Sequence, residues 1–71
     1  MKYKFHEGQR VRIVGNSAIY HYAVLGSVGT ITELRQYGFL PLYQVQCETT
    51  NGQNRQVIIE KDLIAVGAKL V

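Results

Sequence analysis

The sequence predicts an all-β fold, a small barrel of five strands with a short helical turn before the last one. Short segments in which apolar and polar residues alternate recur about every ten residues and are bounded by glycine. Helical periodicity is weak throughout the 71 residues. Because no linker, repeat or low-complexity segment interrupts this pattern, we expect residues 1–71 to form a single domain.

The first strand is predicted at residues 10–14, with Val11 and Ile13 facing the core and the arginines between them facing solvent. The N-terminal segment that precedes it also alternates. We expect Tyr3 and Phe5 to cap the barrel while the neighbouring lysines face water.

The second strand is predicted at residues 26–34. Val28 and Ile31 are three positions apart and cannot share a face of a regular strand. A β-bulge at Gly29 would add one residue and restore the register.

A loop is expected at residues 37–41, followed by the third strand at residues 42–49. The Asn-Gly pair at residues 51–52 is the strongest hairpin signal in the chain, because a type I′ turn needs positive φ at both central residues. It leads into the fourth strand, at about residues 53–59.

The C-terminal part predicts one helical turn at residues 60–62 and a short last strand at residues 63–66. The fourth strand ends in three consecutive apolar residues. Ile58, the middle one, is therefore expected either in a second small cluster or in an exposed contact.

The order of these segments resembles SH3-like barrels of the KOW type and the small SH3-like barrel protein of photosystem I. The likeness is closest to small proteins of bacteria and their phages. The matching pieces are Gly8 to Ile13, Val28 to Ile31, Tyr43 to Val45, Asn51-Gly52 and Glu60 to Leu63. The resemblance implies an SH3-like barrel, a fold that serves many functions.

The chain departs from the ribosomal KOW pattern between its first two strands. Ten residues separate Gly15 from Gly26, where that pattern has only a few. The RNA contacts of KOW domains are therefore not carried over to this chain. The longer loop is instead a candidate binding segment.

Aromatic rings are concentrated in two loops that the resemblance places side by side. Tyrosine and phenylalanine are effective interface anchors because they offer a large contact area at low entropic cost. The alternative is that some of them fold back over the small core. The candidate partner-binding residues are Tyr20, His21 and Tyr22 in the first loop and Tyr37 and Phe39 in the second.

Basic residues on the outer faces of the alternating segments could form a stripe that contacts nucleic acid. The alternative is a set of solvated strand faces whose charges protect the sheet edges. The formal net charge is only +3. The residues of this candidate stripe are Lys2, Lys4, Arg10, Arg12 and Arg35, with Lys61 as an extension.

The composition argues against catalysis and against a bound metal or cofactor. His6 and His21 are the only histidines, and with one cysteine they lack a ligand spacing. Cys47 alternates with apolar residues and is expected to be buried. No catalytic triad, carboxylate pair or phosphate-binding loop is recognisable.

Without a second cysteine, a secretory leader or a long apolar run, we expect a cytoplasmic protein with no membrane contact. The leading functional expectation is a non-enzymatic protein-binding module, such as a small adaptor, regulator or inhibitor, that docks on a larger protein. The alternative is an RNA- or DNA-binding barrel. A structural role through self-assembly is a third interpretation.

Overall fold

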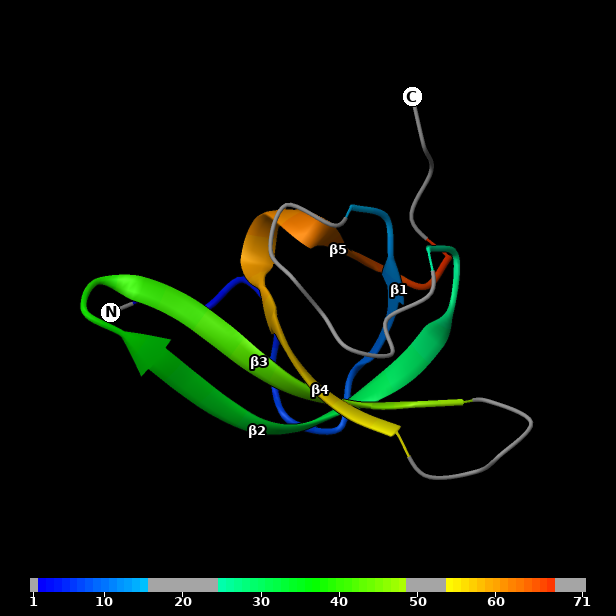
Figure 1. Cartoon of the computed structure of the whole chain (residues 1–71), viewed down its shortest axis with the longest axis horizontal. Coiled ribbons are helices and arrows are strands. Elements are labelled where there is room, and N and C mark those ends of the chain that lie inside the picture. The colour runs from blue at the N-terminus through cyan, green and yellow to red at the C-terminus, as the bar shows by residue number, and fades with distance from the viewer. Residues whose placement is uncertain (1, 16–24, 49–53, 68–71) are drawn as a thin grey trace.

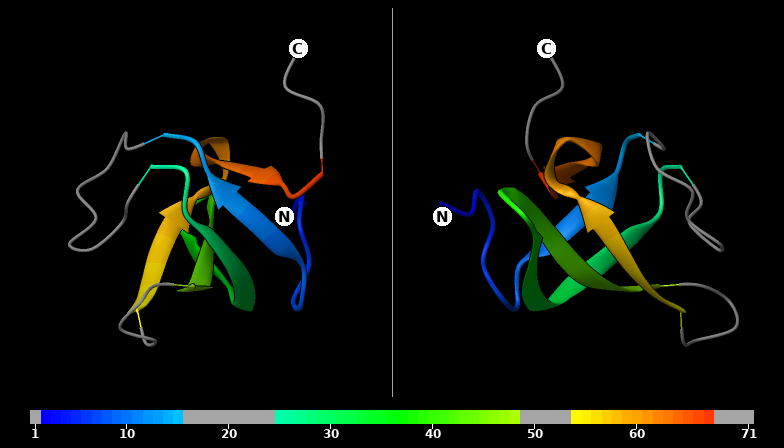
Figure 2. Two further views of the ribbon diagram at one scale, coloured as in Figure 1. Left: turned by 90° about the vertical axis from the view of Figure 1, so that its right-hand side faces the viewer. Right: turned by 60° about the vertical axis from the view of Figure 1, so that its left-hand side comes forward.

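Five strands form one antiparallel sheet in the order β4-β3-β2-β1-β5 in this computed structural model, which describes residues 2–15, 25–48 and 54–67. The sheet curves around its own inner face (Figures 1 and 2). The predicted all-β class, strand count and helical turn are confirmed. The elements are β1 (Arg10–Ile13), β2 (Val28–Tyr37), β3 (Leu40–Cys47), β4 (Asn54–Ile59), the 3-10 turn η1 (Glu60–Asp62) and β5 (Leu63–Ala65).

The core lies on the concave face of the sheet, where alternate residues of each strand are buried. Val11 and Ile13 are fully enclosed, as their spacing predicts. Phe5 is also buried and Tyr3 packs against the core, which confirms that the N-terminal segment caps the barrel. The buried apolar set is Phe5, Val11, Ile13, Ile31, Tyr43, Val45, Cys47, Ile58 and Leu63.

The predicted bulge at Gly29 is wrong, because the irregularity in β2 lies between Ile31 and Glu33. Gly29 pairs regularly with Val11 on one side and with Cys47 on the other. Gly29 and Ile31 therefore share the buried face, and Val28 does not need to join them.

Glycine is required at position 29 because the neighbouring strand passes so close. A Cβ atom there would lie 2.5 Å from Val45 Cγ1 and 2.7 Å from the carbonyl oxygen of Gln46. Both distances are shorter than van der Waals contact, and the oxygen belongs to the backbone of β3. Gly29 thus lets β2 and β3 pack tightly across the centre of the sheet.

The predicted loop at residues 37–41 is also wrong, because β2 and β3 continue into it as paired strands. Tyr37 pairs with Leu40, so the connection is a two-residue turn of Gly38 and Phe39. Gly38 has a φ of 61°, and no described non-glycine residue has positive φ. Glycine at the first central position is the signature of a type II′ hairpin turn.

The end of β4 resolves the two alternatives for Ile58. Its side chain is fully buried and joins the main core, so it forms no separate cluster and no exposed contact. Val57, its neighbour, is the exposed residue of this run. After Ile59 the chain leaves the sheet through η1 and returns as β5 beside β1.

A Gly29→Ala substitution should destabilise the protein by about 2 kcal/mol or more, because the added methyl group collides with backbone that cannot move independently. Thr30→Ala, on the outer face of the same strand, should cost less than about 1 kcal/mol. Urea unfolding followed by circular dichroism would measure both. Equal midpoints for Gly29→Ala and the unmodified protein would contradict this account of the strand contact.

Cys47 should react slowly with a thiol reagent in the folded protein. Its side chain is 2% exposed, and burial raises the pKa of the thiol, which lowers its thiolate fraction. Reaction then requires unfolding, and for a domain of this size we expect protection of about 100-fold or more. The rise in absorbance after adding an aromatic disulfide, with and without guanidinium, would measure the reaction rates of the unfolded and the folded protein. Equal rates in both conditions would contradict the burial of Cys47.

Candidate functional site

The hairpin of β2 and β3 extends beyond the rest of the sheet. The last pair between β3 and β4 is Leu42 with Ile59, whereas β2 and β3 remain paired as far as Tyr37 and Leu40. Figure 1 shows this two-stranded extension projecting past the end of β4. The edge of β3 that faces away from β2 therefore has no neighbouring strand in this extension.

The tip of this extension exposes large apolar side chains. Phe39 is 99% exposed and Tyr37 is 79% exposed, while Leu40 is 46% exposed. Because Tyr37 and Leu40 are register partners, their side chains stand next to each other on one face. That face is opposite to the one on which Tyr43 is buried. The sequence-predicted residues Tyr37 and Phe39 are thus brought together at one exposed tip.

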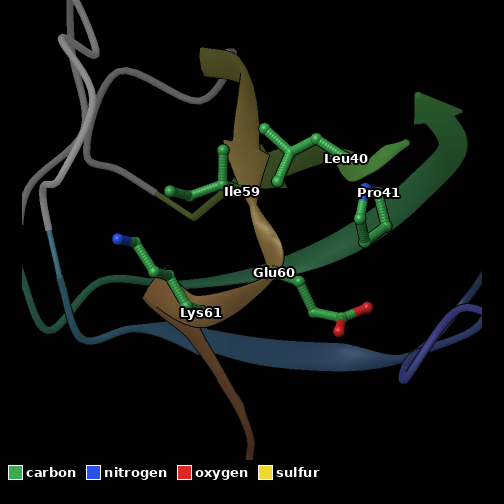
Figure 3. A pocket seen from close by; sticks show the side chains of 5 residues that line it. All are labelled: Leu40, Pro41, Ile59, Glu60 and Lys61. Carbon is green, nitrogen blue, oxygen red and sulfur yellow. The ribbon is translucent and has the colours of Figure 1, made fainter. Parts of the chain in front are cut away.

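A pocket of about 390 Å³ lies beside the tip, where β4 ends and η1 begins. The chain turns away from the sheet after Ile59, so the first residues of η1 stand across from the start of β3. Proline is suited to this unpaired flank of β3, because no neighbouring strand requires its missing N–H. The residues that line the pocket are Leu40, Pro41, Ile59, Glu60 and Lys61 (Figure 3).

One carboxylate oxygen of the acidic residue in the pocket accepts hydrogen bonds from other parts of the protein. Glu60 Oε2 accepts the backbone N–H of Lys4 at 3.0 Å and the hydroxyl of Tyr43. The Tyr43 hydroxyl also accepts the N–H of Phe5 at 3.2 Å. Burial and the hydrogen bond to Glu60 raise the pKa of Tyr43 to about 12. These bonds tie the N-terminal segment to η1.

Lys61 differs from Glu60 in both direction and partners. Figure 3 shows its side chain running toward Ile59, while the Glu60 carboxylate turns the other way. Lys61 is exposed and forms no ion pair or hydrogen bond with any residue in the described ranges. The pocket therefore combines an apolar lining with one ammonium group open to solvent.

The arginines of the predicted basic stripe are exposed, but each already has a partner. Arg10 forms an ion pair of 2.8 Å with Glu48, and Arg12 Nη1 donates to the carbonyl of Gly26 at 2.9 Å. Arg35 contacts two neighbouring polar side chains, those of Glu33 and Gln44.

The lysines of the stripe lie elsewhere. Lys2 and Lys4 are exposed, as predicted. The backbone N–H of Lys4 donates to Glu60 Oε2, and the Lys4 ammonium lies over the Phe5 ring, 5.5 Å from its centroid. The structure therefore places Lys4 beside Phe5 and Glu60, and Arg10 and Arg12 on β1.

The other predicted aromatic residues, Tyr20, His21 and Tyr22, lie outside the described residues. The flanks of their loop are described. Gly15 follows β1 and Leu25 precedes β2, so both flanks lie at the beginning of β2, while Phe39 follows its other end. The hairpin tip is consequently a candidate site in its own right.

Sequence reasoning missed the pocket, although it named Lys61 as an extension of the basic stripe. The local pattern predicts Leu40 and Pro41 in a loop and Ile59 at the end of an apolar run. The Gly-Phe pair between two alternating segments is a hairpin signal that would have extended both strands. The contact between β3 and η1 has no local sequence signal.

The described residues contain no group of three or more histidine, cysteine, aspartate or glutamate side chains placed to hold a metal ion. In the same ranges, no helix combines the length and the apolar character needed to cross a bilayer. The full sequence matches no known protein family and no curated protein.

Replacing Tyr43 by phenylalanine should change how stability depends on pH. The folded protein keeps the Tyr43 proton to about pH 12, whereas the unfolded chain releases it near the ordinary pKa of 10.0. The stabilising contribution is therefore complete below pH 10 and is lost as the pH rises from about 10 to 12. A shift of this size corresponds to about 3 kcal/mol.

Urea midpoints between pH 7 and pH 12 would check this prediction. Tyr43→Phe should be less stable at pH 7 by about 1–3 kcal/mol, since it removes one buried and one partly buried hydrogen bond. It should also lose less stability above pH 10 than the unmodified protein. Tyr37→Phe is the matched control at an exposed tyrosine. Parallel pH curves for Tyr43→Phe and Tyr37→Phe would refute the assignment.

Proposed function

We propose that this protein is a non-enzymatic binding module that docks on a larger protein through the tip of the β2–β3 hairpin. The observation that carries the proposal is the exposure of Phe39, at 99%, on a tight turn that also carries Tyr37. A small adaptor, regulator or inhibitor of bacterial or phage type fits both this surface and the SH3-like resemblance.

The energetics support an interface at this position. Burying a phenylalanine side chain yields about 1.5–3 kcal/mol, and the fold gains none of this from Phe39. A type II′ turn with glycine at its first position holds the aromatic ring on a defined backbone. Less conformational entropy is then lost on binding than for a flexible loop.

A nucleic-acid function is the alternative, and one observation favours it. Arg10 and Arg12 are both exposed on the outer face of β1, as the stripe requires. Their partners, Glu48 and the Gly26 carbonyl, would have to be exchanged for phosphate. Such binding would weaken with salt, with a slope of about one unit for each phosphate contacted.

The test is an affinity pull-down from lysate of the native host, with and without nuclease. Phe39→Ala and Tyr37→Ala should each reduce the recovered partner by about tenfold, because exposed aromatic anchors dominate interface energies. Both variants should unfold at nearly the same urea concentration as the unmodified protein, since neither side chain is buried.

Val57→Ala is the matched control, because Val57 is an exposed apolar residue on β4 away from the tip. It should leave the recovery unchanged. Recovery that depends on nuclease treatment, or that falls equally in Val57→Ala and Phe39→Ala, would count against the protein-docking proposal. In the first case an Arg10→Gln and Arg12→Gln double variant should then lose binding.

A further inference from the structure

We infer that the pocket beside the hairpin tip binds a segment of the partner in which an apolar side chain is followed or preceded by acidic residues. This inference rests on the proposed protein-docking function and specifies its ligand. It is carried by the combination of an apolar pocket, a solvent-facing lysine and a carboxylate that turns away from this lysine.

The interior of the pocket selects for an apolar side chain. Leu40, Pro41 and Ile59 contribute hydrocarbon from two strands, and the volume of about 390 Å³ lies within the range of ligand pockets, roughly 300–1,000 Å³. Leu40 is also the register partner of Tyr37. An inserted side chain would therefore continue the apolar surface of the tip instead of forming a separate contact.

The charges at the rim select for carboxylates next to that side chain. The Lys61 ammonium has no partner among the described residues, and Figure 3 shows the Glu60 carboxylate turned away from it, toward the donors of its Oε2 atom. The net charge of +3 acts in the same direction.

Other occupants fit these features less well. A nucleic acid would pair with the lysines but would leave the apolar pocket unfilled. A second copy of the chain that docked symmetrically would bring a second Lys61 toward the same rim, where like charges repel.

The proposed experiment selects binders from a random library of twelve-residue peptides displayed on phage, with the unmodified protein as bait. We expect enriched sequences to carry an aromatic or aliphatic residue flanked by aspartate or glutamate. The best peptide, synthesised with a fluorescent label, should bind with a Kd that rises at least tenfold in Leu40→Asp and in Lys61→Glu.

Arg55→Glu is the matched control, because it makes the same change in net charge on an exposed residue at the other end of β4. It should raise the Kd less than threefold. Urea midpoints of all variants would establish that they fold. Amide chemical shifts should change at Leu40 and at Ile59–Lys61 when the peptide is added.

The outcomes separate the two proposals. Enriched peptides that are basic or uncharged, or that bind Lys61→Glu as well as Arg55→Glu, would overturn the acidic ligand while leaving docking through Phe39 intact. Selection of no peptide, together with a pull-down that depends on nuclease, would overturn both. A dimer in sedimentation that Leu40→Asp dissociates would replace the peptide with a second copy of the chain.

Discussion

The packing of the N-terminal segment and η1 against the sheet depends on the two hydrogen bonds of the Tyr43 hydroxyl. This hydroxyl accepts the N–H of Phe5 and donates to the carboxylate of Glu60, so one buried oxygen joins the N-terminal segment, β3 and η1. The ring packs edge-to-face against Phe5 and Tyr3, with centroids 5.4 and 5.7 Å away. Segments far apart in the sequence thereby close one end of a small core.

The candidate site follows from the same hydrogen bonds. Because Glu60 Oε2 accepts from the Tyr43 hydroxyl and the Lys4 N–H, its carboxylate turns away from Lys61, whose exposed side chain stands at the pocket. The end of β4 at Ile59 leaves the neighbouring flank of β3 uncovered. The hydrogen bonds that hold Glu60 and stabilise the fold therefore also determine which charged group stands at the pocket.

Much of the fold was predictable because it depends on local alternation. Val11 and Ile13 are buried where their spacing places them, and Cys47 is enclosed on the predicted face. The predictions that proved wrong, the bulge at Gly29 and the loop at residues 37–41, concern features that depend on how two strands pair. Gly29 looks like a bulge within one strand, yet its role is a close approach to Val45, which is distant in the sequence.

The sequence by itself determined the class of fold and the inward-facing residues of the strands, whereas the exposure of Tyr37 and Phe39 was one of two alternatives that the structure decided. Periodicity and turn preferences are properties of neighbouring residues, so they can be recognised along the chain. Only the tertiary structure decided that Leu40 and Pro41 meet Ile59 and Lys61 in one pocket. That contact joins segments about twenty residues apart, and its geometry depends on where β4 ends and which way Glu60 turns.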